Sequence, residues 1–262
     1  WAKKPRRALV TAPTFAEYAA ALESAGCTVE RFFLREQEDF AVTDAFCAAI
    51  RPGVDMVFLC QPNNPTGQLT ALPLVEQILC RCAACGTLLV VDECFLDFLP
   101  DHALHTAKGL LGEGDLVILK AFTKLYGMAG VRLGYALSAD TALLEQMQAC
   151  GQPWGVSSLA QAAGLAALEE AVYVEKVRAL IAEQRPRLTA GLRALGLRVL
   201  DGRANYLLFQ APETLGEALR QRGAVLRSCA NYPGLGPGWY RTAVRTEPEN
   251  EQLLKLLAEV LE

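Results

Sequence analysis

Short apolar runs with β-strand character alternate with helical segments through the first two-thirds of the chain, and this alternation constrains the fold most. The predicted strands share branched and aromatic residues, and they span residues 8–11, 28–33, 56–60, 88–92, 116–121 and 132–138. Predicted helices separate most of them, at residues 15–25, 44–51, 72–85 and 141–150. Strands that are apolar on both faces and alternate with helices form a mostly parallel sheet between two helical layers. We therefore predict an α/β fold with three layers.

The last third of the chain predicts a second, smaller unit. A helical stretch runs from Ser157 to about Leu192, and it holds no helix-breaking residue before Pro186. Shorter strands follow at residues 198–200, 205–209, 225–227 and 240–244, with helices at 212–222 and 248–261. We predict a large domain at residues 1–188, which ends in a long linking helix, and a small C-terminal α+β domain at residues 189–262.

Composition excludes several classes of function. The 262 residues are 52% apolar and carry a net charge of −4, which gives no basic field for nucleic acid or for an anionic membrane. No apolar run approaches the roughly 20 residues of a membrane span. Nine cysteines without a secretory signal favour a reducing cytoplasm. The cluster Cys80, Cys82 and Cys85 falls on a predicted helix and has no second cluster to complete a metal site, so we expect no metal.

Polar residues follow the ends of several predicted strands. Asn64, Asp92 and Lys124 lie at or just after such ends, and Arg132 lies eight residues past the lysine. Ligands bind at the carboxyl ends of parallel strands. A deprotonated lysine attacks aldehydes, a carboxylate keeps a pyridine nitrogen protonated, and an arginine binds phosphate. The set predicts a site for an aldehyde cofactor with a pyridine ring and a phosphate, on which Phe15 could stack.

Each of these residues alone has a plainer interpretation. A single lysine is most often an exposed surface residue, and an aspartate after a strand is often a helix cap. The segment 64–67, Asn-Pro-Thr-Gly, forms a tight turn in many proteins. Arg241 and Arg245 together also fit the charged face of a strand. It is their joint order and spacing that indicates chemistry.

The same residues carry a resemblance to a known family. Segments 62–67 and 91–93, with Lys124 and Arg132, resemble the fold-type I pyridoxal-phosphate enzymes, the aspartate aminotransferase superfamily, from about Pro5 to the C-terminus. These segments are similar to the histidinol-phosphate aminotransferase branch. Longer segments resemble the threonine-phosphate decarboxylases of cobalamin biosynthesis more closely; they are residues 15–18, 153–156, 202–206 and 227–235.

The resemblance implies a role for each site residue. Lys124 is the catalytic Schiff-base lysine, Asp92 pairs with the pyridine nitrogen, and Asn64 bonds the phenolic oxygen of the cofactor. Phe15 stacks on the ring, and Thr123 with Arg132 holds the cofactor phosphate. For the substrate, Arg241 binds the α-carboxylate, Arg227 meets the phosphate, and Asn205 lines the same pocket. The resemblance further implies pyridoxal 5′-phosphate as the cofactor, a small phosphorylated amino acid as the substrate, and a homodimer.

We expect decarboxylation of L-threonine O-3-phosphate to aminopropanol phosphate. Two alternatives stay open: a histidinol-phosphate or related aminotransferase, and a non-catalytic aminotransferase-like domain that senses a ligand. The absence of a DNA-binding segment or basic arm from the sequence argues against the sensor.

Three departures from the family pattern qualify this expectation. Phe95 stands where many aminotransferases have a tyrosine, and the decarboxylases are similar to this chain there. Ala121 stands where the family commonly has a serine on the cofactor phosphate, and one missing hydrogen bond costs about 1 kcal/mol. The chain starts at Trp1 without a methionine, whereas relatives carry a further N-terminal part with a glycine-rich phosphate loop. We expect the chain to continue a longer protein.

Overall fold

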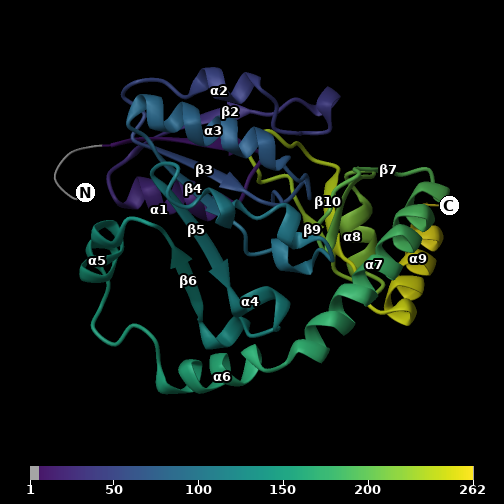
Figure 1. The fold of residues 1–262 in the computed structure, drawn as a ribbon. Coiled ribbons are helices and arrows are strands. Elements are labelled where there is room, and N and C mark those ends of the chain that lie inside the picture. The colour runs from purple at the N-terminus through teal and green to yellow at the C-terminus, as the bar shows by residue number, and fades with distance from the viewer. Residues whose placement is uncertain (1–5, 262) are drawn as a thin grey trace.

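The computed structural model describes residues 6–261, which form two β-sheets. The large sheet has the strand order β2-β1-β3-β4-β5-β6 and the small sheet the order β7-β8-β10-β9. Figure 1 shows the large sheet in the purple-to-teal part of the chain and the small sheet beside the green and yellow helices. The strands of the large sheet are β1 (Arg7–Ala12), β2 (Thr28–Phe33), β3 (Met56–Cys60), β4 (Leu88–Asp92), β5 (Leu116–Ala121) and β6 (Gly134–Leu137). Those of the small sheet are β7 (Arg198–Val199), β8 (Tyr206–Gln210), β9 (Arg227–Ser228) and β10 (Trp239–Ala243).

Nine α-helices and five 3-10 turns connect these strands within the described residues. The α-helices are α1 (Ala16–Ser24), α2 (Ala45–Ala49), α3 (Leu72–Cys85), α4 (Phe122–Leu125), α5 (Thr141–Cys150), α6 (Ser158–Leu168), α7 (Ala171–Ala194), α8 (Leu215–Arg220) and α9 (Glu247–Leu261). The 3-10 turns are η1 (Glu36–Glu38), η2 (Leu96–Phe98), η3 (His102–Leu104), η4 (Ala107–Leu110) and η5 (Ala129–Val131).

The large sheet is parallel from β2 through β5, and only β6 pairs antiparallel to its neighbour. Alternate side chains of its strands enter two different cores, as the pleat of a strand requires. One core packs Leu59 and Val91 against α2 and α3. The opposite core packs Val10 against α1, and a neighbouring cluster packs Val90 against α5. Figure 1 shows α2 and α3 on one side of the sheet and α1 on the other. The predicted three-layer α/β fold is confirmed.

The carboxyl ends of β3, β4 and β5 meet at one edge of this sheet. Cys60 at the end of β3 is in register with Asp92 at the end of β4. Asn64 lies in the turn after β3, and Lys124 lies in the helical turn that follows β5 at Ala121. The strand order reverses between β1 and β3, which is the place where sheets of this type bind ligands. The fold therefore places Asn64 next to the topological switch point, and Asp92 and Lys124 farther along the same carboxyl edge.

The long helical stretch differs from its prediction. The structure divides it into α6 and α7, with a break at Glu169 and Glu170, and α7 continues through Pro186. A proline inside a helix removes one backbone hydrogen bond. Tertiary packing compensates, because the α7 residues Leu188 and Leu192 are fully buried against the small sheet. No glycine or proline marks the break at 169–170, so local sequence gave no signal for it.

The small sheet is antiparallel and packs on both faces. One face buries Leu207 and Phe209 against helices α7, α8 and α9. The other face buries Leu208 and Trp239 against Phe40, which follows β2 of the large sheet. Because one apolar cluster contains residues of both parts of the chain, the small sheet is fixed beside the carboxyl edge of the large one. The domain boundary at residues 188 and 189 stays a prediction.

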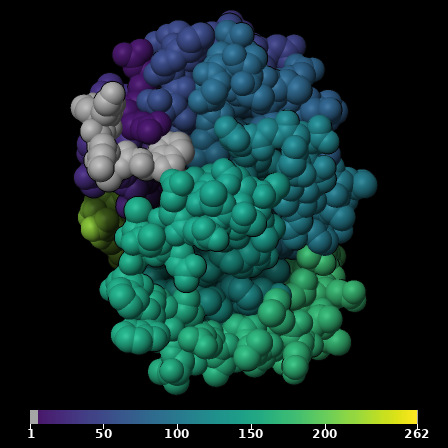
Figure 2. Space-filling view, turned by 60° about the vertical axis from the view of Figure 1, so that its left-hand side comes forward, coloured from purple at the N-terminus to yellow at the C-terminus, as the bar shows by residue number. Residues whose placement is uncertain are grey.

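The segment around α6 exposes a series of apolar side chains. Trp154 is 95% exposed, and the others, 65–82% exposed, are Leu159, Leu165, Leu168 and Val172. Figure 2 shows this green surface along the lower edge of the molecule. A run of large exposed apolar side chains is typical of an interaction surface. Within residues 6–261, no helix combines the length and the apolar character needed to cross a membrane.

Candidate active site

Lys124 is presented by the single helical turn α4 directly after β5. Phe122 and Leu125 of this turn are buried and hold it against the protein. Phe122 also donates its backbone N–H to the carbonyl of Leu133, at 3.1 Å, which ties the turn to the residue directly before β6. Lys124 itself is exposed, and its Nζ lies 5.5 Å from the centre of the Phe95 ring. The amine is thus held at the carboxyl edge of the sheet and is open to a ligand.

Asp92 ends β4 with hydrogen bonds to both carboxylate oxygens. Oδ1 accepts the backbone N–H of Cys94 at 2.9 Å, and Oδ2 accepts the hydroxyl of Tyr18. The pKa of Tyr18 is raised well above its usual value, mainly because the side chain is buried and further because Cys60 and Asp92 lie nearby. Burial and the charge of Asp92 also raise the pKa of the Cys60 thiol, to about 12. The tyrosine and the thiol therefore stay neutral beside the carboxylate at physiological pH.

Asn63, which precedes the predicted site residue, organises the turn after β3. Its Oδ1 accepts the hydroxyl of Thr14 at 2.8 Å, and its Nδ2 donates to the carbonyl of Pro13 at 2.9 Å. Its carbonyl accepts the hydroxyl of Tyr206, also at 2.9 Å. The side chain and the backbone carbonyl of Asn63 thus join the loop after β1, the turn after β3 and strand β8 of the small sheet. These bonds hold Asn64 in a fixed position.

Asn64 connects the large sheet to Arg241 of β10. Its Oδ1 accepts a hydrogen bond from the Arg241 guanidinium, and it accepts a second from the Tyr232 hydroxyl at 3.4 Å. The guanidinium also lies over the ring of Tyr206, 5.0 Å from its centre. Because the amide oxygen is occupied by two donors, the amide nitrogen of Asn64 is the group left to donate to a ligand.

A cavity of about 340 Å³ lies between the lysine turn and the small sheet. Four predicted site residues line it: Lys124, Asn205, Arg227 and Arg241. The remaining lining residues are Phe95, Tyr206, Val225, Leu226, Thr242, Ala243 and Arg245. The side-chain oxygen of Asn205 is buried and has no hydrogen-bond partner. A buried polar atom without a partner is costly, so this one is suited to a ligand that donates a hydrogen bond.

The other predicted residues do not line this cavity. Phe15 is 38% exposed and packs edge-on against Tyr18, with 5.5 Å between the ring centres. Thr123 is half-buried beside Lys124. Arg132 is exposed, and its guanidinium donates to the carbonyl of Ala129 at 3.0 Å. The proposed phosphate contacts of Thr123 and Arg132 therefore stay predictions.

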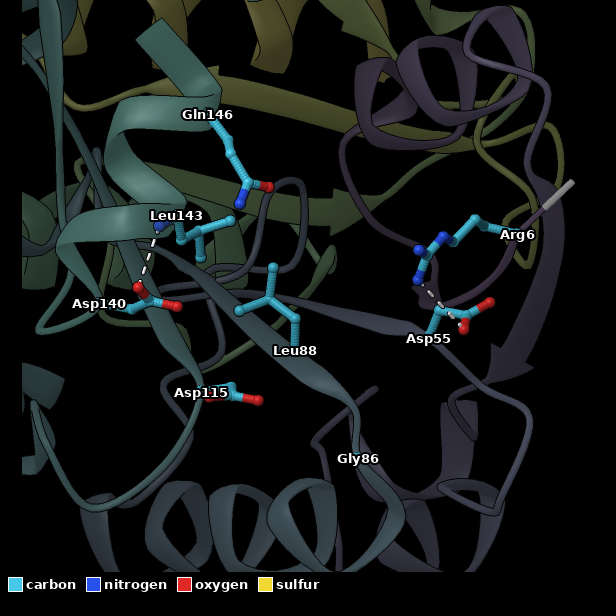
Figure 3. Close-up of a pocket in the computed structure, with 8 residues that line it drawn as sticks. All are labelled: Arg6, Asp55, Gly86, Leu88, Asp115, Asp140, Leu143 and Gln146. Carbon is cyan, nitrogen blue, oxygen red and sulfur yellow. Dashed lines mark hydrogen bonds and ion pairs between the residues drawn. The ribbon is translucent and has the colours of Figure 1, made fainter. Parts of the chain in front are cut away.

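A second hollow, of about 180 Å³, lies at the opposite edge of the sheet (Figure 3). It is lined by Arg6, Asp55, Gly86, Leu88, Asp115, Asp140, Leu143 and Gln146. Three of its charged groups have structural partners: Arg6 pairs with Asp55 at 3.5 Å, and Asp140 caps α5 by accepting the N–H of Leu143 at 3.0 Å. Since this hollow lies at the amino ends of the strands, away from Lys124, we expect the chemistry at the first cavity.

Comparison with known proteins identifies the family. The family model described as aminotransferase class I and II matches residues 1–257. The chain belongs to this family. It is 40% identical to the threonine-phosphate decarboxylase of Salmonella typhimurium, over 98% of this chain and 72% of that protein. It is 34% identical to a histidinol-phosphate aminotransferase of Lactiplantibacillus plantarum, over 96% of this chain and 69% of that protein.

Solved structures of the family share the fold. The histidinol-phosphate aminotransferase of Clostridium acetobutylicum superimposes with a TM-score of 0.92, at 26% identity, and covers 98% of this chain and 78% of its own. As a member of the aminotransferase class I and II family, the chain is an enzyme that depends on pyridoxal phosphate.

The site residues fit this cofactor. Lys124 offers an amine at the mouth of the cavity, Asp92 offers a carboxylate that two donors hold, and Asn64 offers an amide donor. Lysine, carboxylate and amide are the groups that a pyridine aldehyde with a phenolic oxygen requires. We expect Asp92 to face the ring nitrogen and Lys124 the aldehyde carbon.

Sequence reasoning missed the residues that support the site. Tyr18 carried a signal, because it lies three residues after Phe15 and so shares a face of α1. Asn63 carried none beyond its neighbour Asn64. Lys120 lies on strand β5, four residues before Lys124, and is almost fully buried, where it pairs with Glu93 at 3.1 Å. The residue type alone does not show whether a lysine is buried or exposed.

Proposed function

We propose that this enzyme decarboxylates L-threonine O-3-phosphate. The observation that carries the proposal is the pairing of Arg227 with Arg241, which are register partners on strands β9 and β10. Both side chains line the cavity that contains Lys124. Like charges directly opposite each other destabilise a sheet, so this pair is suited to a ligand with two anionic groups. Threonine phosphate carries a carboxylate and a phosphate.

The surroundings of the two arginines suggest which anion each binds. Arg241 is half-buried and is held by Asn64 and the ring of Tyr206, so it suits the α-carboxylate, which must be oriented closely. Arg227 is exposed and lies 5.8 Å from the centre of the Tyr232 ring, so it suits the phosphate at the mouth. A guanidinium binds either anion through paired N–H donors.

The cofactor, Arg241 and Lys124 have different roles in the proposed reaction. Pyridoxal phosphate supplies a conjugated pyridinium that accepts the electron pair of the bond broken at the α-carbon. Arg241 determines which bond breaks, because it fixes the direction of the carboxylate. Lys124 then delivers a proton to the α-carbon. Phe95 presents a ring without a hydroxyl next to the lysine, so this side chain offers no second proton donor there.

The relatives favour decarboxylation and also support a second candidate. The relative with 40% identity is a threonine-phosphate decarboxylase. Histidinol-phosphate aminotransferases follow at 34% identity and include the solved structure with a TM-score of 0.92. An aminotransferase would use the same cofactor and the same lysine, but it would remove a proton from the substrate where the decarboxylase removes carbon dioxide.

Two incubations separate the candidates. The enzyme with cofactor is given threonine phosphate in one and histidinol phosphate with 2-oxoglutarate in the other. Release of carbon dioxide from the first alone supports the proposal, and turnover of the second that depends on the keto acid contradicts it. Borohydride reduction should place the cofactor label on Lys124. Lys176→Ala, which changes an exposed lysine of α7, is the control that should keep the label.

We also propose a homodimer, and the exposed apolar side chains around α6 support this proposal. Burying them against a second copy would remove from water a surface that single chains rarely expose.

A further inference from the structure

Tyr18 is a buried tyrosine whose hydroxyl points at a residue of the cofactor site. The side chain is 7% exposed, and its ring stacks on Phe58 with 5.1 Å between centres and 26° between planes. Its hydroxyl donates to Oδ2 of Asp92, from a residue 74 positions away in the chain. The bond is therefore a product of the tertiary fold, since it joins α1 to the end of β4.

The two hydrogen bonds to Asp92 fix the plane of its carboxylate. Tyr18 holds one oxygen, and the backbone N–H of Cys94 holds the other. An aspartate at a strand end otherwise has free rotation about two side-chain bonds. Hydrogen bonds from neutral donors to a carboxylate are charge-assisted and stronger than bonds between neutral groups. The hydroxyl remains a donor throughout the physiological range, because burial raises the pKa of Tyr18.

Helix α1 connects this bond to the expected stacking residue. Phe15 lies at the N-cap of α1 and Tyr18 lies one turn later, and their rings are in edge-to-face contact. Phe15 is expected on the face of the cofactor ring and Asp92 at its nitrogen. One short helix thus sets the position of both groups.

We propose that Tyr18 is a positioning residue that aims the Asp92 carboxylate at the ring nitrogen of the bound cofactor. The inference rests on the proposed role of Asp92, and it does not depend on whether the enzyme removes carbon dioxide or a proton. Tyr18 makes no contact with the substrate in this role. Its effect is confined to the part of cofactor affinity that comes from the ring nitrogen.

The test compares two cofactors in binding titrations, followed by absorbance. One is pyridoxal 5′-phosphate, and the other is 1-deazapyridoxal 5′-phosphate, in which a C–H group replaces the ring nitrogen. Tyr18→Phe keeps the ring and its packing on Phe58 and removes only the donor. We expect this variant to bind pyridoxal phosphate about tenfold more weakly, the size expected for one hydrogen bond to a charged group. Its affinity for the deaza compound should match that of the unaltered protein.

Tyr240→Phe is the matched control. Tyr240 is also buried, and its hydroxyl donates to the carbonyl of Glu213 at 2.7 Å, in the small sheet. This variant should leave the ratio of the two affinities unchanged. Equal weakening of both cofactors by Tyr18→Phe would overturn the proposal, because it would show that the tyrosine only supports the fold. No weakening of either would overturn it as well.

Asp92→Asn separates the failure of this inference from the failure of its premise. If Asp92 meets the ring nitrogen, this variant loses affinity for pyridoxal phosphate and keeps affinity for the deaza compound, and adding Tyr18→Phe to it causes no further selective loss. If Asp92→Asn shows no selective loss, the assigned role of Asp92 is wrong and the role of Tyr18 falls with it. If Asp92→Asn is selective and Tyr18→Phe is not, only the inference about Tyr18 is overturned.

Discussion

Lys120 and Glu93 form an ion pair of 3.1 Å in which the two side chains are 2% and 0% exposed. Asp97 supplies a second carboxylate to the same ammonium at 2.8 Å. The Glu93 carboxylate also accepts hydrogen bonds from the backbone N–H of Ala107 at 2.7 Å and from the hydroxyl of Thr106 at 2.8 Å. Lys120 is four residues before Lys124, and Glu93 follows Asp92. The ion pair therefore holds the ends of β4 and β5 together, next to Asp92 and Lys124.

Lys120→Met should destabilise the enzyme strongly. Removing one partner of a buried ion pair leaves an uncompensated charge, which costs about 3–5 kcal/mol. Chemical denaturation of the enzyme with cofactor measures this loss. The double variant with Glu93→Gln removes the stranded charge and should recover part of the stability. A double variant as unstable as the single one would contradict this account.

The same ion pair predicts a loss of stability at alkaline pH. Burial alone lowers the pKa of Lys120, but the carboxylates of Asp97 and Glu93 outweigh it and raise the pKa above its ordinary value. A group whose pKa is raised by folding stabilises the protein fully below its unfolded pKa, about 10.4, and loses this contribution as the pH passes its folded pKa. Melting temperatures should therefore fall more steeply above about pH 10 in the unaltered protein than in Lys120→Met.

Arg241→Gln should abolish most turnover of threonine phosphate while cofactor is retained. Losing one partner of a desolvated charge pair costs roughly 2–5 kcal/mol, so kcat/KM should fall at least about thirtyfold. Carbon dioxide release measures the rate, and visible absorbance measures bound cofactor. Arg220→Gln, on the exposed face of α8, should keep full activity. A rate within twofold of that of the unaltered enzyme would show that Arg241 does not bind the substrate carboxylate.

Gly202→Ala should disturb the turn that carries Asn64. A Cβ at Gly202 would lie 2.8 Å from the backbone of Gly67 and the carbonyl of Thr66. Both contacts are with backbone atoms, which cannot move aside as a flexible side chain can. Overpacking of this kind costs about 1–3 kcal/mol. Thermal unfolding should show the loss, and cofactor affinity should fall with it. Gly109→Ala, at a position with open space and ordinary backbone angles, is the control.

Leu165→Glu should dissociate the proposed homodimer. Leu165 is 69% exposed in one chain, and a carboxylate buried at an interface would be unpaired. Light scattering coupled to size-exclusion chromatography gives the mass of each species. Ala182→Glu adds the same charge at an exposed position of α7 and should leave the mass unchanged. If Leu165→Glu has the mass of the unaltered protein, this part of α6 lies outside any interface between copies.

The sequence predicted the large sheet closely because its signals are local. Runs such as 88–92 and 116–121 are apolar and β-branched, and the structure has strands at these residues. The start of the last strand of this sheet was predicted wrongly. The run 132–138 predicted a strand from Arg132, yet this residue has φ +58° and the strand begins at Gly134. Backbone angles at a strand end depend on the turn before it, which the composition of the run does not encode.

By itself, the sequence determined the α/β class and the order of lysine, aspartate and asparagine along it, since strand periodicity and residue type are properties of neighbouring positions. Only the tertiary structure decided what surrounds these groups. The Tyr18 hydroxyl reaches Asp92 across 74 positions, and Arg241 reaches Asn64 across 177. Such contacts form when distant segments pack together. A buried polar group needs a hydrogen-bond partner, and any segment that packs next to it can supply one.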